Sequence, residues 1–224
     1  MKTPDPVLLI DVGNTHIHVG AGGPFRARKL FNLPTAEFSI PKFKTRMRGT
    51  KFQGAMVSSV VPALNRPLRK ILATLGIQPV RFLDGTTPLP LKIRYTHPET
   101  IGADRLANAV AAVQIYGVPV VAVDAGTATT FDVVDVKGRF LGGVIAPGLT
   151  LMAEGLHSKT ALLPVVRPHL GPRAIGRSTR EAIALGLMTG YTGLVREILK
   201  SILAEQRTRD VKVCATGGAA NSGS

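Results

Sequence analysis

One short pattern occurs twice, about half a chain apart, and it constrains the fold more than any other feature. Its first copy runs Leu8-Leu9-Ile10-Asp11-Val12-Gly13-Asn14-Thr15, and its second runs Val120-Val121-Ala122-Val123-Asp124-Ala125-Gly126-Thr127. In each copy an apolar, branched segment typical of a buried strand ends at an aspartate, and a glycine turn with hydroxyl or amide groups follows. Such turns can hold phosphate groups and metal ions, so the repeat indicates a duplicated domain with nucleotide held between its halves.

The expected elements follow the same order in both halves: a strand, a hairpin partner, a further strand and a helix. Strands of the first half are expected at residues 7–10, 17–20, 55–61 and 80–83, with a helix at 65–75 and a polar, exposed segment at 42–51. Strands of the second half are expected at residues 118–123, 131–136, 140–145 and 211–215, with helices at 149–156 and 181–203. An alanine-rich helix at 102–116 precedes the second half. The pattern predicts an α/β fold with mixed sheets and two similar lobes, residues 1–117 and 118–224, with a cleft between them.

The chain is strongly basic. It carries 28 Lys and Arg against 14 Asp and Glu, a net charge of +14, while its 45% apolar content is that of a globular protein. A basic surface raises the local concentration of any anionic ligand, from ATP to nucleic acid. Aromatic residues make up only 5% of the chain and do not interleave with the basic runs. A solvated basic face is therefore favoured, and nucleic-acid binding is not expected although the charge permits it.

The few cysteines and histidines argue for a reducing compartment and against a metal cluster. The single Cys214 lies in an apolar segment, where it is expected in the core, and it excludes an internal disulfide. His16 and His18 alternate beside the first glycine turn and are expected on the surface. The apolar segment before Asp11 is too short for a signal peptide, and no apolar stretch approaches the length of a membrane span. We expect a cytoplasmic protein without membrane contact.

Several segments carry a resemblance to a known family. They are Asp11–Thr15, Gly102–Leu106, Asp124–Thr130, Gly142–Gly148, Thr179–Ile183 and Thr216–Gly218. In this order and spacing, over nearly the whole chain, they are similar to type III pantothenate kinase, a branch of the actin-like ATPase superfamily of sugar kinases and heat-shock ATPases. The resemblance implies two lobes of ribonuclease H-like, actin-like type. It also implies a homodimer that transfers the γ-phosphate of ATP to pantothenate, the first step of coenzyme A synthesis.

The two repeated turns are the expected phosphate and cation sites. Asp11 ends a strand, so its carboxylate could hold Mg²⁺ directly or through water, although an Asx-type turn closing a hairpin would also explain the sequence. Gly13 lets the backbone approach phosphates, and the segment from Asp11 to Thr15 is expected to bind ATP. The resemblance implies that Thr127 contacts the ATP phosphates. It also implies that Asp124 helps to hold a monovalent cation, K⁺ or NH₄⁺.

The expected substrate site centres on Asp104, in the first turn of the alanine-rich helix. Stabilisation of the helix dipole would also explain a carboxylate there. The resemblance aligns Asp104 with a catalytic base, which would take the proton of the primary hydroxyl of pantothenate. Arg105 could bind the substrate carboxylate through a forked pair, and Gly102 and Ala103 allow close backbone approach. Tyr95 stands where the family has a substrate-contacting tyrosine, although a lone tyrosine is more often a packing residue.

Two features near the end of the chain complete the resemblance. Ser178 and Glu181 form a capping-box sequence that by itself explains a helix start, and Thr179 aligns with a substrate-binding threonine of the family. After Gly218 the family usually continues into a closing helix, whereas this chain has the small and polar segment Ala219–Ser224. In the family this helix would cover part of the nucleotide side or brace the first lobe, so the resemblance leaves ATP affinity and stability open while it still places Asp104.

Two other functions are considered beside the kinase. One is a non-catalytic, basic transcription-accessory protein on the same fold, since the family has also carried a transcription-accessory name. The other is a phosphohydrolase of the same superfamily, which would need no alcohol acceptor. The joint presence of Asp11, Asp104, Asp124 and Thr127 favours the kinase, because a binding module needs no such set of acids.

Overall fold

The computed structural model describes residues 6–23, 26–169, 173–206, 208 and 210–218, and the chain divides into two compact units. Residues 1–88 and 97–107 form the first unit, and residues 89–96 and 108–224 form the second. Each unit contains one five-stranded sheet. The two lobes predicted from the sequence, residues 1–117 and 118–224, divide the chain differently from these compact units, which place residues 89–96 and 108–117 in the second unit. The lobe boundary at residue 117 stays a prediction.

The first unit is built on a mixed sheet of order β3-β2-β1-β4-β5. Its strands are β1 (Val7–Val12), β2 (His16–Gly22), β3 (Ala27–Pro34), β4 (Ala55–Ser59) and β5 (Val80–Phe82). Neighbours β1, β2 and β3 pair antiparallel, and β4 pairs parallel with both β1 and β5. Side chains of β1 are alternately buried, as expected for a strand that packs on one face. Since β1 and β4 are parallel, their carboxyl ends meet at one edge of the sheet.

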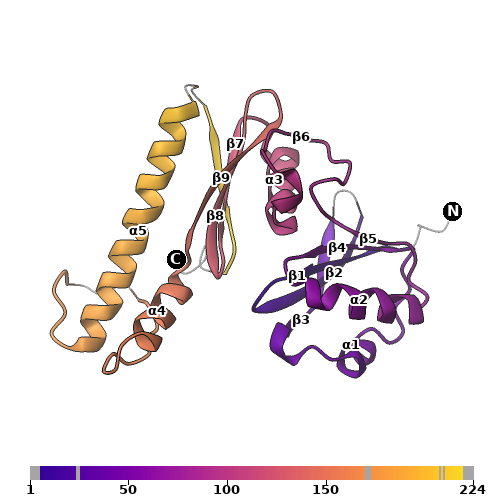
Figure 1. Cartoon of the computed structure of the whole chain (residues 1–224), viewed down its shortest axis with the longest axis horizontal. Helices are drawn as coiled ribbons and strands as arrows, with labels where there is room; N and C mark the ends of the chain where they lie inside the picture. Colours follow the sequence, from indigo (N-terminus) through magenta and orange to yellow (C-terminus); the bar gives the residue numbers. More distant parts are fainter. Residues whose placement is uncertain (1–5, 24–25, 170–172, 207, 209, 219–224) are drawn as a thin grey trace. The chain divides into compact units, whose positions relative to one another are not determined.

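Two helices cover this sheet (Figure 1). Helix α2 (Pro62–Thr74) begins with a proline, buries Leu68, Ile71 and Leu72, and is followed by Gly76 in the left-handed region at φ +73°. Helix α1 (Ile40–Arg46) falls largely in the segment expected to be polar and exposed. That expectation missed the helix and its apolar side, because Phe43 and Met47 are buried while the charged residues between them face solvent.

The second unit is built on a mixed sheet of order β10-β7-β8-β9-β6. Its strands are β6 (Lys92–Ile93), β7 (Val120–Ala125), β8 (Ala128–Val134), β9 (Arg139–Pro147) and β10 (Lys212–Thr216). The meander β7-β8-β9 is antiparallel, β10 pairs parallel with β7, and β6 pairs parallel with β9. The carboxyl ends of β7 and β10, the start of β8 and the end of β9 consequently lie at one end of this sheet.

The duplication expected from the sequence is visible in the strand order. The four-stranded order β3-β2-β1-β4 of the first sheet recurs as β9-β8-β7-β10 in the second, with the same parallel and antiparallel pairings. In both sheets the first strand of the repeat carries the aspartate near its carboxyl end. The predicted α/β fold with two mixed sheets is confirmed.

Helices of the second half pack on the second sheet and on each other. Helix α3 (Ala103–Tyr116) ends before Gly117, which adopts φ +75°, and α4 (Leu149–Ser158) follows β9 directly. Helix α5 (Thr179–Gln206) packs through one end against α4 and through Ile202 against β7 and β8. In Figure 1, α5 runs along one side of the second sheet and α3 lies on the other. Short 3₁₀ turns occur at Thr35–Glu37 and Pro98–Thr100.

Helix α5 corrects one expectation from the sequence. It is 28 residues long, and its most apolar stretch has a mean hydropathy of 1.2, so length and composition alone would let it cross a membrane. Gly186, Gly190 and Gly193 interrupt its apolar residues, so the helix contains no long continuous apolar segment. Core helices of globular proteins pass the same test, but they are mostly buried, whereas 11% of this stretch is buried. Burial along the helix is concentrated at residues such as Ile183, Ala184 and Leu187, which contact α4.

Candidate functional site

In the first unit, Asp11 lies near the carboxyl end of β1 beside the equivalent position of β4. Asp11 and Ser58 are partners in the parallel pairing, and the Ser58 hydroxyl donates a hydrogen bond of 3.0 Å to Asp11 Oδ1. The carboxylate is half-buried, on the opposite side of β1 from the buried Ile10 and Val12. A carboxylate and a hydroxyl at a strand end provide the oxygen ligands that a hard cation or its water shell prefers.

The turn after Asp11 is closed and braced from a second direction. The Gly13 N–H donates to the His16 carbonyl at 2.9 Å, which closes the hairpin between β1 and β2. The Thr35 hydroxyl donates to the Gly13 carbonyl at 2.7 Å, and the Thr35 N–H donates to the Thr15 carbonyl at 2.9 Å. Asn14 and Thr15 are exposed at the tip. The turn is therefore a fixed backbone loop with accessible donors, as a phosphate site requires.

The start of α3 lies close to this strand end, within the first unit. The Val60 N–H donates to the Val12 carbonyl at 3.0 Å, which ties the end of β4 to the end of β1. A Cβ atom on Gly102 would lie 3.7 Å from Val60 Cγ1 and only 2.5 Å from Asp104 Oδ1. Gly102 thus leaves the space that the Asp104 carboxylate occupies. Asp104 is half-buried, and its Oδ1 accepts the Arg105 N–H at 2.8 Å.

Two neighbours of Asp104 are buried. Ala103 is 4% exposed and Arg105 is 6% exposed. A buried guanidinium retains its charge and requires oxygen partners around it, and carboxylates satisfy its fork geometry. The role of Arg105 toward a substrate carboxylate stays a prediction.

In the second unit, Asp124 occupies the place that Asp11 has in the first. Asn108 of α3 donates a hydrogen bond of 2.9 Å from Nδ2 to Asp124 Oδ2. Thr216 at the end of β10 is the pairing partner of Asp124, and Gly217 follows at φ +94°. A Cβ atom on Gly217 would lie 2.5 Å from Asp124 Oδ1 and 2.7 Å from the Ala125 carbonyl oxygen. Two oxygens therefore converge on a space that a larger residue would fill.

The turn after Asp124 meets the start of α4. The Gly148 N–H donates to the Thr127 carbonyl at 3.0 Å, and a Cβ atom on Gly148 would collide with the carbonyl oxygens of Gly126 and Thr127. Gly148 is the N-cap of the ten-residue helix α4 and supplies no side-chain cap. Thr127 is exposed beside it. N–H groups at a helix start next to an exposed hydroxyl are favourable for binding an anion.

Tyr95 lies two residues after the end of β6 and packs on the second sheet. Its ring centroid is 6.3 Å from that of Phe140, and the residue is 38% exposed. A Cβ atom on Gly142 would lie 2.9 Å from Tyr95 Cε2. The tyrosine is thus neither a core residue nor a free surface residue, which fits a ring that offers one side to a ligand.

Thr179 is the first residue of α5, and the predicted cap is confirmed. The Glu181 N–H donates to Ser178 Oγ at 3.3 Å, and Glu181 Oε2 accepts the Arg177 N–H at 2.7 Å. The glutamate therefore reaches one residue further back than in the standard capping box, in which it accepts the N-cap N–H. Thr179 is exposed at this helix start.

The histidines and the cysteine behave largely as expected. His16 and His18 are exposed on β2 with ring centroids 6.1 Å apart, and His18 Nδ1 lies 3.0 Å from the side-chain amide of Asn32. Among the described residues no group of three or more His, Cys, Asp or Glu is placed to hold a metal ion. Cys214 is half-buried in β10 rather than fully buried, and its partial burial raises the pKa of the thiol. A thiol with a raised pKa is a poor nucleophile at neutral pH.

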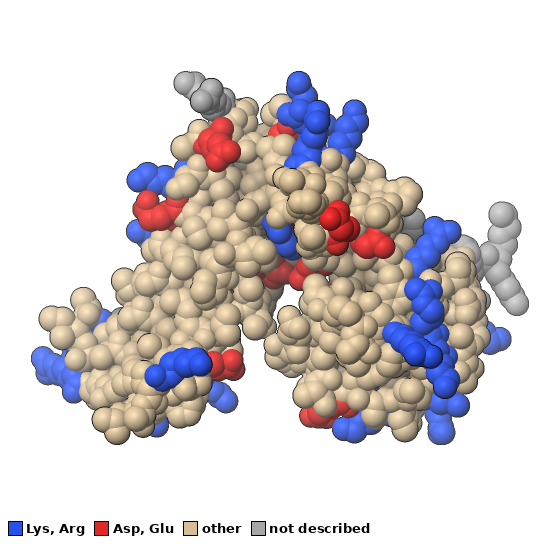
Figure 2. All heavy atoms as spheres, in the orientation of Figure 1, with Lys and Arg blue, Asp and Glu red and all other residues tan. Residues whose placement is uncertain are grey.

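The basic excess gathers in the first unit. Residues 26–81 hold twelve Lys and Arg against the single acid Glu37. In Figure 2, blue side chains follow one another down the side of the unit that contains α1 and α2. Some of these cations have partners within the unit: Lys42 pairs with Glu37, and Arg46 and Arg69 lie over the rings of Phe31 and Phe82.

Several positions of the site were missed by reasoning from the sequence. Ser58 reaches Asp11 through the register of β4, and Thr35 reaches Gly13 from the 3₁₀ turn after β3, so neither contact has a local signal. Asn108 had a local signal, since it is a polar residue four positions after Asp104 in an alanine-rich helix. Gly148 and Gly217 had the Pro-Gly and Thr-Gly-Gly signals, but their contacts with the Asp124 turn depend on the fold.

Comparison with known proteins identifies the relatives of the chain. A family model for type III pantothenate kinase matches residues 7–201. The type III pantothenate kinase of Methylacidiphilum infernorum is 41% identical over 213 residues, which are 95% of this chain and 77% of the relative. That of Akkermansia muciniphila is 42% identical over 212 residues, which are 94% of this chain and 86% of the relative.

Solved structures support the fold at lower identity. A Baf family protein from Campylobacter jejuni superimposes with a TM-score of 0.57 at 21% identity, over 95% of this chain and 84% of that one. The ethanolamine utilization protein EutJ from Carboxydothermus hydrogenoformans gives a TM-score of 0.53 at 14% identity, over 99% of this chain and 79% of that one. At such identities the likeness shows the shared fold and nothing about activity.

Proposed function

The chain belongs to the type III pantothenate kinase family, whose activity is the ATP-dependent phosphorylation of pantothenate in the first step of coenzyme A synthesis, and we propose that Asp104 is the base of this reaction. One observation carries the proposal. Gly102 makes room for the Asp104 carboxylate at the start of α3, beside the strand end that bears Asp11. A half-buried carboxylate next to a phosphate turn is placed for proton transfer rather than for packing.

Asp104 would act on the alcohol as follows. Its carboxylate accepts the proton of the primary hydroxyl while the hydroxyl oxygen forms a bond to the γ-phosphorus of ATP. The bond between that phosphorus and the bridging oxygen breaks, and ADP leaves with the electron pair. The hydrogen bond from the Arg105 N–H to Oδ1 holds the carboxylate in one orientation. This restraint keeps the base aligned with the hydroxyl. Alignment of the reacting groups contributes much of the rate acceleration in such reactions.

The two glycine turns are proposed to hold ATP. In the first unit the exposed Asn14 and Thr15, at the tip of the Asp11–Thr15 turn, would donate to phosphate oxygens. In the second unit the exposed Thr127 hydroxyl and the first N–H groups of α4 would do the same. These donors are fixed by backbone hydrogen bonds at Gly13 and Gly148, so binding requires little ordering of the protein.

The donor sets also fit the cations that the family implies. Asp11 with Ser58 offers the one or two oxygen ligands that Mg²⁺ takes from protein when phosphates supply the rest. Asp124 Oδ1 and the Ala125 carbonyl converge on the space beside Gly217, as a weakly hydrated monovalent cation requires. The bound cations would neutralise the charge that develops on the phosphate oxygens.

The remaining assignments concern the substrate and the assembly. Tyr95, Arg105 and Thr179 are proposed to contact pantothenate, Arg105 through its carboxylate and Thr179 at a helix start that favours anions. We further propose a cytoplasmic homodimer. Its support is membership of the family, together with the exposed apolar residues Leu162 and Ile175 in the segment before α5.

Replacing Asp104 by Asn tests the base. The amide preserves the shape of the side chain but cannot take the proton, so we expect kcat to fall on the order of a thousandfold. Pantothenate binding should change little. The matched control is Asp84→Asn, a carboxylate of the same unit in an exposed turn, which should keep full activity. An Asp104→Asn enzyme with the kcat of the wild type would exclude Asp104 as the base.

Two alternatives are testable beside the kinase, and the basic first unit bears on the first of them. A transcription-accessory protein would bind DNA with a steep dependence on salt and would release no ADP. A phosphohydrolase would release phosphate from ATP or polyphosphate at the same rate with and without pantothenate. The kinase releases ADP only when the alcohol is present.

A further inference from the structure

We propose that Gly142 and the turn formed by Asp135 and Arg139 are a positioning device for Tyr95, and so set the affinity for pantothenate. The inference rests on the proposed contact between Tyr95 and the substrate. It concerns residues that do not touch the substrate themselves and act through the placement of one ring. All of them belong to the second unit.

The first part of the device is the pairing of β6 with β9. Strand β6 contains only two residues, so few hydrogen bonds hold the segment that carries Tyr95. The Lys92 N–H donates to the Gly138 carbonyl at 3.2 Å, and the Arg94 N–H donates to the Phe140 carbonyl at 2.8 Å. The position of Tyr95, one residue after Arg94, is therefore set by the carbonyls of residues 138 and 140.

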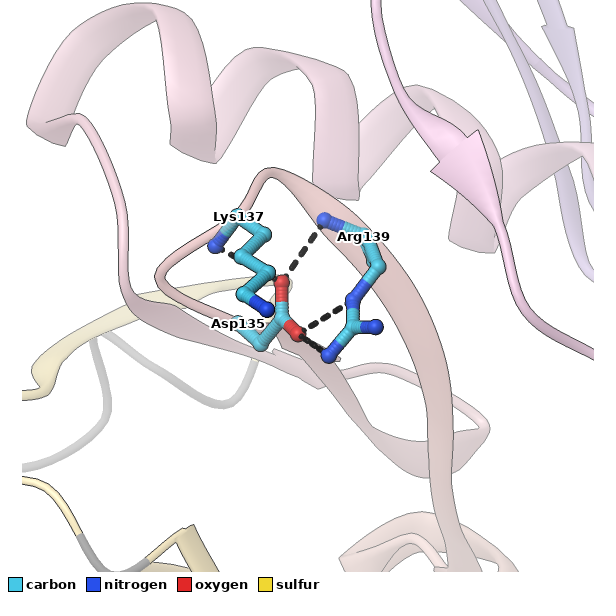
Figure 3. A network of polar contacts seen from close by, with 3 residues as sticks. All are labelled: Asp135, Lys137 and Arg139. Atoms are coloured by element: carbon cyan, nitrogen blue, oxygen red, sulfur yellow. Dashed lines mark hydrogen bonds and ion pairs between the residues drawn. The ribbon is translucent and has the colours of Figure 1, made fainter.

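The second part is a rigid turn that presents these carbonyls (Figure 3). Asp135 is 6% exposed and accepts hydrogen bonds from the Lys137 N–H, the Arg139 N–H and Arg139 Nε at 2.9, 2.9 and 2.6 Å. The guanidinium of Arg139 also pairs with Asp135 Oδ2. The backbone closes the same turn, since the Gly138 N–H donates to the Asp135 carbonyl at 3.0 Å. Because both the side chain and the backbone of Asp135 hold the turn, we infer that the turn keeps the Gly138 and Phe140 carbonyls in fixed positions.

The third part is the surface on which the ring rests. Phe140 is fully buried and its ring lies against that of Tyr95 with an interplanar angle of 52°. Gly142 has φ +108°, and a Cβ atom there would lie 2.9 Å from Cε2 and 3.1 Å from Cδ2 of Tyr95. The first distance is shorter than real Cβ contacts and the second is tighter than most of them, so a side chain at residue 142 must displace the ring by a few tenths of an ångström. Glycine at residue 142 serves two purposes: it leaves space for the Tyr95 ring, and it adopts a positive φ that other residues rarely adopt.

Two matched glycines separate ring displacement from backbone strain. Gly142→Ala introduces both, whereas Gly76→Ala introduces strain at φ +73° just after α2, outside the device, with nothing within 4 Å of the new methyl group. We expect Gly142→Ala to raise the KM for pantothenate about tenfold, the loss of roughly one good contact. The KM for ATP and the kcat should change less than twofold. Gly76→Ala should leave all three constants near those of the wild type while lowering the melting temperature.

A double-mutant cycle with Tyr95→Ala tests the mechanism. Once the ring is absent, Gly142→Ala should raise the KM for pantothenate no further, because the methyl group has nothing to displace. Phe140→Leu provides a second variant that removes the supporting ring without straining the backbone. It should also raise this KM, to a lesser extent.

The outcomes distinguish the inference from the assignment beneath it. If Tyr95→Ala leaves the KM for pantothenate unchanged, the proposed contact between Tyr95 and the substrate is wrong. If Tyr95→Ala raises it but Gly142→Ala matches Gly76→Ala, the contact stands and the positioning device is refuted. Additive effects of Tyr95→Ala and Gly142→Ala would refute it as well. Should Gly142→Ala fail to fold, an unchanged KM in Phe140→Leu would overturn the proposal.

Discussion

The buried Asp135 turn permits a quantitative prediction about stability. Replacing Asp135 by Ala removes the acceptor of three hydrogen bonds and the partner of the Arg139 guanidinium. The aspartate side chain is 9% exposed and that of Arg139 is 32% exposed. Breaking a buried pair costs about 3–5 kcal/mol, and the partial access of water to Arg139 places this one near the lower end, about 3 kcal/mol.

Asp84 provides a matched comparison. Its Oδ1 accepts four hydrogen bonds, from the N–H and hydroxyl groups of Thr86 and Thr87, but the turn is exposed. Water replaces these partners when the carboxylate is removed, so Asp84→Ala should cost only about 1 kcal/mol. The contrast between the two variants isolates burial, because both carboxylates accept several hydrogen bonds within a local turn.

The dependence on pH follows from the pKa of Asp135. Burial alone would raise this pKa, but the hydrogen bonds from Arg139 and Lys137 and the charge of Arg139 outweigh burial and lower it. A carboxyl group with a lowered pKa in the folded protein stabilises it fully above the unfolded pKa of about 3.9. That stabilisation is lost as the pH falls through the lowered folded pKa. The difference between wild type and Asp135→Ala should be constant from pH 5 to 8 and shrink below pH 4.

Urea and thermal unfolding followed by circular dichroism measure both effects. For a chain of 224 residues, 3 kcal/mol corresponds to a fall in melting temperature of about 10 °C. Asp84→Ala should lower it by about 3 °C. Equal losses in the two variants would refute the argument from burial. A difference from wild type that persists unchanged to pH 3 would refute the assigned pKa direction.

Two further predictions concern the cation space at Gly217. Replacing K⁺ by Na⁺ should depress activity, because the smaller ion is more strongly hydrated and fits the oxygens of Asp124 and Ala125 less well. Equal initial rates in the two salts would show that Asp124 does not hold a monovalent cation needed for activity. Gly217→Ala places a methyl group against Asp124 Oδ1 and should raise the K⁺ concentration needed for half-maximal rate by about tenfold, a loss of roughly 1.4 kcal/mol. Gly218→Ala, with open space around the new methyl group, should not change it, and matching effects at the two glycines would contradict the proposal.

The sequence predicts the repeated elements of this fold because their signals are local. Alternating or continuous apolar residues mark β1, β4 and β7, and Gly76 and Gly117 mark two helix ends in the left-handed conformation. Helix α1 could not be predicted in the same way. It is one of the shortest helices, its charged residues dominate the composition, and only Phe43 is buried within it.

The edge strands and the supporting residues also escape prediction from sequence. Strand β3 is exposed at half of its eight residues and carries Arg28 and Lys29, so it lacks the pattern of a buried strand. The aspartates Asp11, Asp104 and Asp124 are recognisable from motifs, but their partners Ser58 and Asn108 are brought to them by register and packing. Local sequence thus reveals which residues carry the chemistry, and tertiary structure is needed to reveal what holds them.

The central claim is tested most directly by ADP formation with and without pantothenate, in wild type and Asp104→Asn. The wild type should release ADP only when pantothenate is present, in equal amount to the phosphorylated alcohol. Asp104→Asn should fold with a melting temperature near that of the wild type, bind pantothenate and release almost no ADP. ADP release at the same rate without pantothenate, or unimpaired transfer by Asp104→Asn, would contradict the account.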